Sequence, residues 1–186
     1  PLAWALTISA CEAVPFVRQT YTIDIGHPTD VPFVGSGFSY QEGPQAREPA
    51  WANDTDFRWS RPGCRLRVPV VPGNAHTLVL AGGVPVGFRI LSSGSELAHF
   101  DRSDSGGQYA FDVAPEVTAH RSFLDLTLVN LDPMPLPNLD LRELFWALDR
   151  IEVTTSGPGN VFDPASLPAA DLADAAFRAA LSADDP

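Results

Sequence analysis

Short segments in which apolar and polar residues alternate, each ended by a turn signal, constrain the fold of this chain most strongly. Such alternation places neighbouring side chains on opposite faces of an extended backbone and is typical of half-buried β-strands. Clusters of glycine, proline, serine and asparagine separate the segments, as turns do. A series of short strands with regularly spaced turns predicts an all-β sandwich or barrel. The expected strands are 17–25, 57–71, 76–81, 84–91, 96–102, 108–113, 123–130 and 149–155.

The segment from Phe57 to Val71 carries the clearest alternation. Apolar residues occupy one face and arginines the other, which predicts a single half-buried strand over the whole segment. The apolar face comprises Phe57, Trp59, Cys64, Leu66, Val68 and Val70, and the opposite face comprises Arg58, Arg65 and Arg67.

Other stretches lack this pattern. Residues 27–56 are rich in Pro, Gly, Asp and Asn and are expected to be mostly loop, and a loop of this length is often functional. Residues 165–182 are rich in alanine, with acids early and Arg178 late, which suits the helix dipole and predicts a helix. Residues 141–148 are expected to form a single helical turn. The predicted organisation is an N-terminal apolar segment or strand at 1–17, a β-sandwich at 18–156, and a linker with a short C-terminal α-helix at 157–186.

The charge of the chain argues against one class of partner. The formal net charge is −11, and all twelve basic residues are arginines. Phosphate binding needs a basic surface, so nucleic acid is not expected as a partner, and attraction to an anionic lipid surface is disfavoured for the same reason. With 45% hydrophobic and 19% charged residues, the chain has the composition of a globular domain.

The first residues and the two cysteines leave alternatives open. Residues 2–17 are apolar with few interruptions, which is compatible with an initial strand, the end of a membrane helix or the remnant of a targeting signal. Cys11 and Cys64 either form a disulfide in an oxidising compartment or stay as two reduced thiols. An extracytoplasmic location is expected, periplasmic or at the cell surface, with a membrane-associated parent or complex left open.

Aromatic and charged residues gather in the long loop and at its exit. A sugar site needs an aromatic face for the ring and a few polar groups for the hydroxyls. Glu42 can accept hydrogen bonds from hydroxyls, and Arg58 can pair with Glu42 or donate to a sugar oxygen. Trp59 shares the alternation of its strand, so a place in the core is the competing interpretation. The candidate ligand-binding residues are Tyr40, Glu42, Trp51, Arg58 and Trp59.

No complete catalytic set is evident, and the chain is not expected to be an enzyme. The segment Asp104-Ser105-Gly106-Gly107 looks like the one around the nucleophile of chymotrypsin-like proteases, but no histidine stands in a matching motif, so a Gly-rich hairpin turn is expected. Acidic loop residues match a glycosidase pair by type alone and are expected to be solvated. No cofactor is expected, although a structural calcium stays open at Asp101 with Asp104, or at Asp30, since calcium prefers several hard oxygens.

The order of several short motifs resembles the galactose-binding-domain-like jelly rolls that are appended to bacterial glycosyltransferases and glycan-processing enzymes. The resemblance covers residues 18–155 and implies a non-catalytic β-sandwich that often binds carbohydrate, sometimes with a structural calcium. Gly82-Gly83 stands where an Asn-Gly turn is expected, and the C-terminal helix is a second departure; both leave open whether the usual loop site is kept. The motifs are Ile23–Gly26, Gly37-Phe38 with Glu42, Arg58–Ser60, Cys64–Val70, Tyr109–Val113, Leu126–Asn130, Leu141–Leu144 and Ile151–Val153.

Two functions follow as hypotheses. The leading one is a non-catalytic module that recognises carbohydrate in an envelope or cell-surface glycan system. The alternative is a structural or interaction subunit of a larger complex, held there by its two apolar ends, with the loop aromatics as interface anchors. Exposure of Tyr40, Trp51 and Trp59 around one concave patch would favour the first hypothesis. Burial of the chain ends against another chain would favour the second.

Overall fold

The computed structural model describes residues 16–26, 30–42, 57–83, 87–101, 107–131 and 145–158, with the backbone alone for residues 39–42. Strands dominate this part of the chain, and none of its helices is long and apolar enough to cross a membrane. The elements are β1 (Phe16–Asp24), β2 (Phe38–Glu42), β3 (Phe57–Ser60), β4 (Cys64–Pro69), β5 (Ala75–Gly83), β6 (Phe88–Ser92), β7 (Ser95–Phe100), β8 (Gln108–Val113), α1 (Pro115–Thr118), β9 (Phe123–Asn130) and β10 (Trp146–Pro158).

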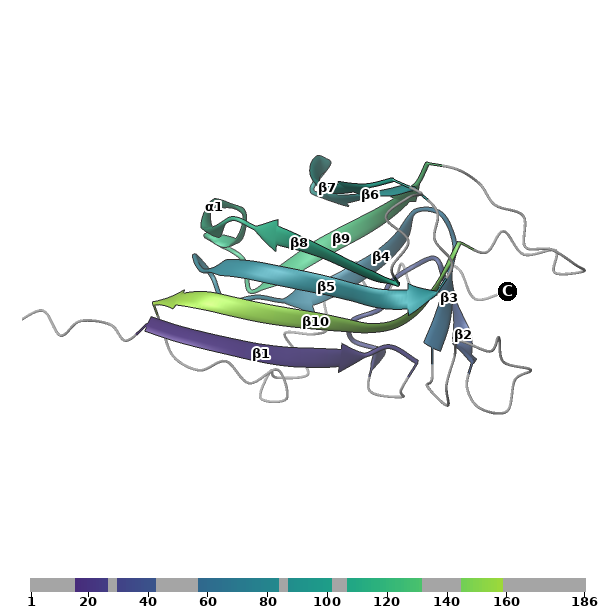
Figure 1. The fold of residues 1–186 in the computed structure, drawn as a ribbon, viewed down its shortest axis with the longest axis horizontal. Helices are drawn as coiled ribbons and strands as arrows, with labels where there is room; N and C mark the ends of the chain where they lie inside the picture. The colour runs from purple at the N-terminus through teal and green to yellow at the C-terminus, as the bar shows by residue number, and fades with distance from the viewer. Residues whose placement is uncertain are drawn as a thin grey trace, which may run out of the picture.

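Two antiparallel sheets face each other. The six-stranded sheet has the order β2-β3-β10-β5-β8, and β1 pairs with the part of β10 that lies beyond β3. The four-stranded sheet has the order β4-β9-β6-β7. In Figure 1, β1, β10, β5 and β8 run side by side in front of β4 and β9.

The strand pairing is that of a jelly roll. Strand β3 pairs with β10, β4 with β9, β5 with β8, and β6 with β7, so each later strand returns beside an earlier one in reverse order. This nested pairing folds one long hairpin into two sheets, which is the arrangement of an eight-stranded jelly roll. The predicted all-β, jelly-roll-type antiparallel sandwich is therefore confirmed, whereas the predicted C-terminal helix lies outside the described residues.

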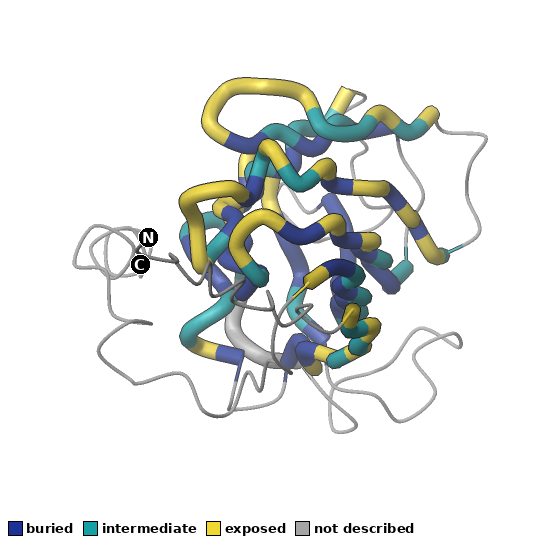
Figure 2. The backbone as a smooth tube through the Cα atoms, turned by 90° about the vertical axis from the view of Figure 1, so that its left-hand side faces the viewer, coloured by how far each residue is buried: buried dark blue, intermediate teal, exposed yellow. Residues whose placement is uncertain are grey.

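The core fills the space between the sheets. Most strands contribute alternate residues to it, as β8 does with Tyr109, Phe111 and Val113. The burial colours of Figure 2 show this alternation along the strands. The ring of Phe88 lies 4.9 Å from that of Tyr109 and 5.1 Å from that of Trp146, in edge-on and tilted contacts that stabilise aromatic clusters. Aromatic packing thus holds the two sheets together near the start of β6.

The predicted single strand over 57–71 is wrong. It is two strands in different sheets, β3 and β4, separated by a turn in which Gly63 has a φ of +80° and Cys64 donates a backbone hydrogen bond to Arg61. The apolar residues occupy odd-numbered positions before this turn and even-numbered positions after it. Arg58 is paired with Leu148, whose side chain lies in the core, so Arg58 is on the inward row of the six-stranded sheet and not on an outer face like Arg65.

Three further expectations need correction. Residues 38–42, expected to be loop, form β2, because the edge of β3 offers hydrogen-bond partners to this short segment. Residues 146–148, expected to be helical, open β10, where the side chains of Trp146 and Leu148 enter the core. The four-residue helix α1 was not expected at all; it starts at Pro115, whose fixed φ suits a first helical turn. Strand pairing thus explains β2 and the start of β10, and the fixed φ of Pro115 explains α1. The hydropathy pattern indicates none of the three.

Candidate functional site

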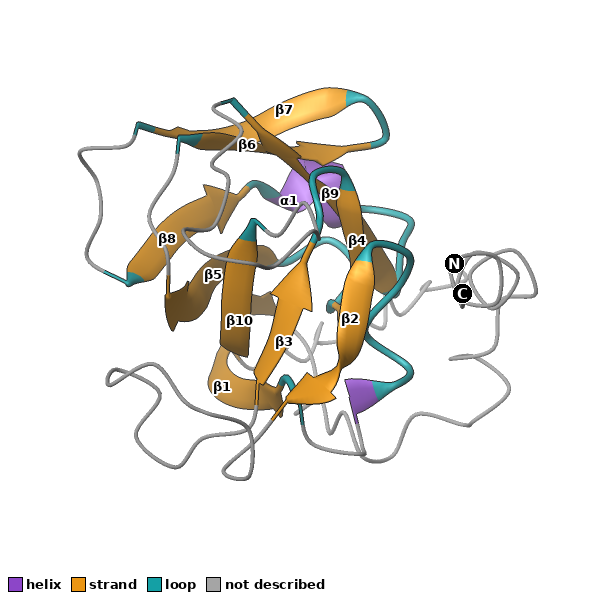
Figure 3. Cartoon of the chain, turned by 90° about the vertical axis from the view of Figure 1, so that its right-hand side faces the viewer, coloured by secondary structure: helices purple, strands orange, loops and turns teal. Residues whose placement is uncertain are grey.

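The structure brings the backbones of four predicted ligand-binding residues together. Strand β2 runs antiparallel to β3, with Gln41 opposite Arg58 and Glu42 opposite Phe57, so Tyr40 and Glu42 lie on the strand next to Arg58 and Trp59 (Figure 3). The side chains of Tyr40 and Glu42 and the whole of Trp51 lie outside the described part. Their role as ligand contacts stays a prediction.

Arg58 makes a buried ion pair that the sequence did not indicate. Its Nε donates to Oδ2 of Asp30 at 2.6 Å and its Nη2 to Oδ1 at 2.9 Å, a two-point contact to a carboxylate that is wholly buried. The backbone N–H of Gly26 donates to the same Oδ2 at 2.6 Å. Both carboxylate oxygens thus already accept hydrogen bonds from N–H groups. The positive charge of Arg58 disfavours a calcium ion at Asp30, which the sequence leaves open.

Trp59 is buried, on the face of β3 opposite Arg58 and outside the core between the sheets. Its exposed fraction is 7%, and it meets Phe57 edge to face with ring centroids 5.9 Å apart. A sugar stacks on an open ring face, which Trp59 does not offer in this conformation. The competing interpretation of Trp59 as a packing residue agrees with this position.

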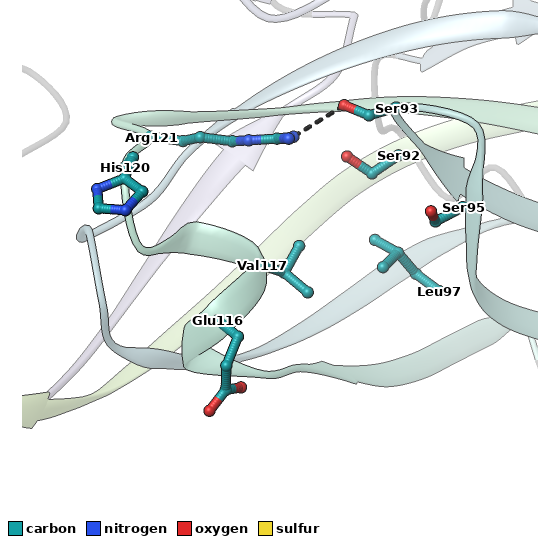
Figure 4. Close-up of a pocket in the computed structure, with 8 residues that line it drawn as sticks. All are labelled: Ser92, Ser93, Ser95, Leu97, Glu116, Val117, His120 and Arg121. Carbon is teal, nitrogen blue, oxygen red and sulfur yellow. Dashed lines mark hydrogen bonds between the residues drawn. The ribbon is translucent and has the colours of Figure 1, made fainter.

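A cavity of about 400 Å³ lies at a different place, between the β6–β7 turn and α1. Its two walls come from segments far apart in the sequence, residues 92–97 and residues 116–121. The cavity is far from the residues predicted as a ligand site, since α1 lies toward the left of Figure 1 and the β2–β3 pair at the right. The cavity is lined by Ser92, Ser93, Ser95, Leu97, Glu116, Val117, His120 and Arg121 (Figure 4).

The first wall is a tight hairpin. Ser93 and Gly94 have positive φ angles of 51° and 81°, the combination that a two-residue type I′ turn requires. This turn pairs Ser92 with Ser95 across the two strands. Ser92 continues the inward row of Phe88 and Ile90, so its side chain lies at the end of the core. The residue is 4% exposed.

The second wall is α1 with the residues that follow it. The hydroxyl of Thr118 donates to the carbonyl of Asn74 at 3.0 Å, which fastens α1 to the turn before β5. The backbone N–H of Arg121 donates to the carbonyl of Thr118 at 3.0 Å. Val117 packs against the core beside the cavity, and Arg121 extends over it.

Some polar groups of the cavity make hydrogen bonds within the described residues, and others do not. The Nη1 of Arg121 donates to the Oγ of Ser93 at 2.9 Å, and this bond closes the upper side of the cavity in Figure 4. The buried Oγ of Ser92 has no hydrogen-bond partner, which is costly for a hydroxyl away from water. Within the described residues, Glu116 and His120 have no side-chain partner either, and Figure 4 places them at the rim.

The chemistry of this cavity suits hydrogen bonding around an apolar floor. Hydroxyls both donate and accept, a carboxylate accepts, and a guanidinium donates. Leu97 and Val117 supply aliphatic surface between these groups. In the described ranges, no cluster of three or more His, Cys, Asp or Glu side chains could hold a metal ion.

The sequence alone does not reveal this cavity. Ser92-Ser93-Gly94 has the composition of a turn between two expected strands, and Glu116, His120 and Arg121 belong to no recognised motif. A weak signal was present, since three serines surround one turn and a charged cluster follows Pro115. Nothing in the sequence indicates that these two segments meet, because the contact depends on how β6 and β8 sit in opposite sheets.

Comparisons with known proteins name no family for this chain. No protein-family model and no curated protein matches it. The ANXUR2 extracellular domain from Arabidopsis thaliana is 14% identical over 74% of this chain, with a TM-score of 0.47, and this chain spans 41% of it. A family two carbohydrate esterase from Cellvibrio japonicus is 10% identical over 80% of this chain and 38% of its own, with a TM-score of 0.39. CBM35 from Cellvibrio japonicus Abf62 is 10% identical over 77% of this chain and all of its own, with a TM-score of 0.35. Likeness at this level says nothing about ligand or activity.

Proposed function

We propose that this chain is a non-catalytic binding module that holds a carbohydrate in the cavity between the β6–β7 turn and α1. One observation carries the proposal: the Oγ of Ser92, a residue of the cavity wall, is buried and has no hydrogen-bond partner among the described residues. A buried hydroxyl without a partner is costly, so a ligand hydroxyl that reached it would form a hydrogen bond that the free protein lacks. The setting proposed is an extracytoplasmic glycan system, as the sequence predicts.

The size and lining of the cavity support a sugar as the ligand. Its volume of about 400 Å³ lies within the range of small-molecule sites. The hydroxyls of Ser92, Ser93 and Ser95 can exchange donor and acceptor roles with sugar hydroxyls, and Arg121 has further N–H groups to donate. The methyl groups of Leu97 and Val117 can pack against the C–H face of a sugar ring.

The arrangement around His120 supports a role in ligand binding rather than in catalysis. Serine, histidine and glutamate all line the cavity, which is the residue set of a nucleophilic relay. A relay requires the histidine to hydrogen-bond both the serine and the acid. Within the described part of the chain, His120 makes neither contact. We therefore assign these groups to ligand binding.

The test is binding of the whole chain to a glycan array. Arg121→Ala is expected to weaken binding, because it removes a donor and opens the wall at Ser93. Arg65→Ala is the matched control, since Arg65 is an exposed arginine on β4, away from the cavity. Glu42→Ala and Trp51→Ala test the site that the sequence predicts in the long loop.

The outcomes separate the hypotheses. Binding lost in Arg121→Ala and kept in Arg65→Ala supports the cavity. Binding lost in Trp51→Ala and Glu42→Ala, with Arg121→Ala unaffected, moves the site to the loop. A well-folded chain that binds no glycan rejects carbohydrate as the ligand and favours the interaction-subunit hypothesis.

A further inference from the structure

A buried histidine takes no part in the proposed site. His76, on β5, is 2% exposed and faces inward, opposite Thr155 of β10 and Val113 of β8. The backbone N–H of Val71 donates to its Nε2 at 3.0 Å. Because Nε2 accepts a hydrogen bond, it carries no proton, and the imidazole is neutral with its proton on Nδ1.

Protonation of this ring would break its contact with Val71. A proton on Nε2 would point at the N–H of Val71, so two donors would face each other. The charge would also be buried, and burial is the main reason that the pKa of His76 lies below its ordinary value of 6.5, with the backbone of Asn74 opposing the shift.

No carboxylate is placed to compensate that charge from the strands beside it. Asp112 of β8 and Glu152 of β10 occupy positions that alternate with Val113 and with Val153, on the outward rows of the sheet. Glu116, in α1, is exposed. Among the described residues, no acidic side chain contributes to the pKa shift of His76.

The contact with Val71 belongs to the turn that holds α1. Within this turn, Asn74 N–H donates to the carbonyl of Val71 at 3.2 Å. The turn then joins α1 through two hydrogen bonds: Thr118 Oγ1 donates to the carbonyl of Asn74 at 3.0 Å, and Gly73 N–H donates to the carbonyl of Thr118 at 3.3 Å. A continuous chain of hydrogen bonds therefore leads from the His76 ring to the helix that forms one wall of the cavity.

We propose that His76 is an acid-sensitive latch for this cavity. In its neutral form it fixes the turn 71–74, and the turn fixes α1 against the β6–β7 hairpin. In its protonated form it releases the turn, so α1 loses its support and the cavity releases its ligand. The binding half of this inference rests on the proposed function, whereas the link between His76 and α1 does not.

Backbone hydrogen exchange, followed by NMR on the whole chain, tests the link directly. The amides of Gly73, Asn74 and Arg121 are expected to lose protection between about pH 7.5 and about pH 5, after correction for intrinsic exchange, while that of Leu78 in the core of β5 stays protected. In His76→Gln, whose amide oxygen can accept from Val71 but does not titrate, the loss is expected to disappear. Equal loss in wild type and His76→Gln, or no loss in wild type, overturns the latch.

The titration of the wild-type ring gives a second measurement in case His76→Gln does not fold. The latch requires the NMR titration midpoint of His76 to coincide with the pH at which these amides lose protection. A midpoint at a different pH, or loss of protection that follows His120, rejects the proposal without any variant.

The binding half is tested by repeating the glycan array at the two pH values. Loss of binding at about pH 5 in wild type but not in His76→Gln, each relative to its own binding at about pH 7.5, is the expected result. Loss that persists in His76→Gln assigns the effect to another group and overturns the inference. An array that is negative at both pH values rejects the proposed function alone, because the exchange measurement still decides the latch.

Discussion

The guanidinium of Arg58 and the wholly buried carboxylate of Asp30 form a two-point ion pair, with N–O distances of 2.6 and 2.9 Å. The pair joins the segment after β1 to the inward row of β3. Strands β1 and β3 lie end to end along the same edge of β10, so this ion pair closes the gap between them. Arg58 thus has a structural role that its place in an apparent sugar-binding loop does not reveal.

Removal of Arg58 is expected to destabilise the fold. Arg58→Ala leaves the Asp30 carboxylate buried without its cation, which typically costs about 3–5 kcal/mol of unfolding free energy. Arg65→Ala, at an exposed position, is expected to stay within about 0.5 kcal/mol of wild type. Urea denaturation measures both. If Arg58→Ala kept its stability and lost glycan binding, Arg58 would be a ligand contact, as the sequence predicts.

Ser92→Ala is expected to separate stability from binding. The Ser92 hydroxyl has no hydrogen-bond partner among the described residues, so its removal should change the unfolding free energy by less than about 0.5 kcal/mol, or raise it. Binding in the cavity should weaken about three- to tenfold, since one ligand hydrogen bond is lost. Thermal denaturation and a binding titration with a glycan identified on the array check the two halves. Unchanged affinity would remove Ser92 from the site.

The thiol of Cys64 is expected to be inert in the native state. Cys64 is a buried free cysteine, and burial raises its pKa to about 12, so almost no reactive thiolate exists near neutral pH. In a Cys11→Ser background, a thiol reagent should leave Cys64 unlabelled under native conditions and label it fully in denaturant. Rapid native labelling would show that the β4 end of the core opens readily.

Gly37 is expected to tolerate no side chain. Its φ is +85°, and a Cβ added there would lie 2.8 Å from the Cα of Cys64. Gly63 offers a matched control, because its φ is +80° but a Cβ there would meet nothing within 4 Å. Gly63→Ala should cost about 1–2 kcal/mol for the left-handed backbone alone, and Gly37→Ala should cost more. Equal losses in denaturation experiments would contradict the close approach to Cys64.

Stability is expected to fall in acid through His76. Because its pKa in the folded state is lowered, the unfolded chain takes up a proton first as the pH drops below 6.5, and the folded state then loses free energy relative to it. The loss continues until the pH reaches the lowered pKa of the folded state and then levels off. The melting temperature of wild type should therefore drop more than that of His76→Gln between about pH 7.5 and about pH 5. Parallel curves would reject this contribution.

Several elements could be predicted from local sequence, and the errors have identifiable causes. Strands β8 and β9 match the expected ranges, because each alternates cleanly between two turn signals. Alternation occurs on both sides of Pro62-Gly63, so hydropathy alone indicates one strand over 57–71. This turn instead sends the chain to the other sheet. The candidate ligand residues were chosen by type, whereas the ion pair of Arg58 depends on Asp30, which is 28 residues away.

The all-β class, the strand periodicity and the acidic charge follow from local sequence, because these depend on residue type and on spacing within a few positions. The folded structure is needed to show which strands share a sheet, that Arg58 pairs with Asp30, and that the serines of the β6–β7 turn meet Arg121. Those relationships arise when the long hairpin folds over and brings distant segments within hydrogen-bond distance. Local alternation carries no information about that closure, since the same pattern fits any partner strand with a matching inward face.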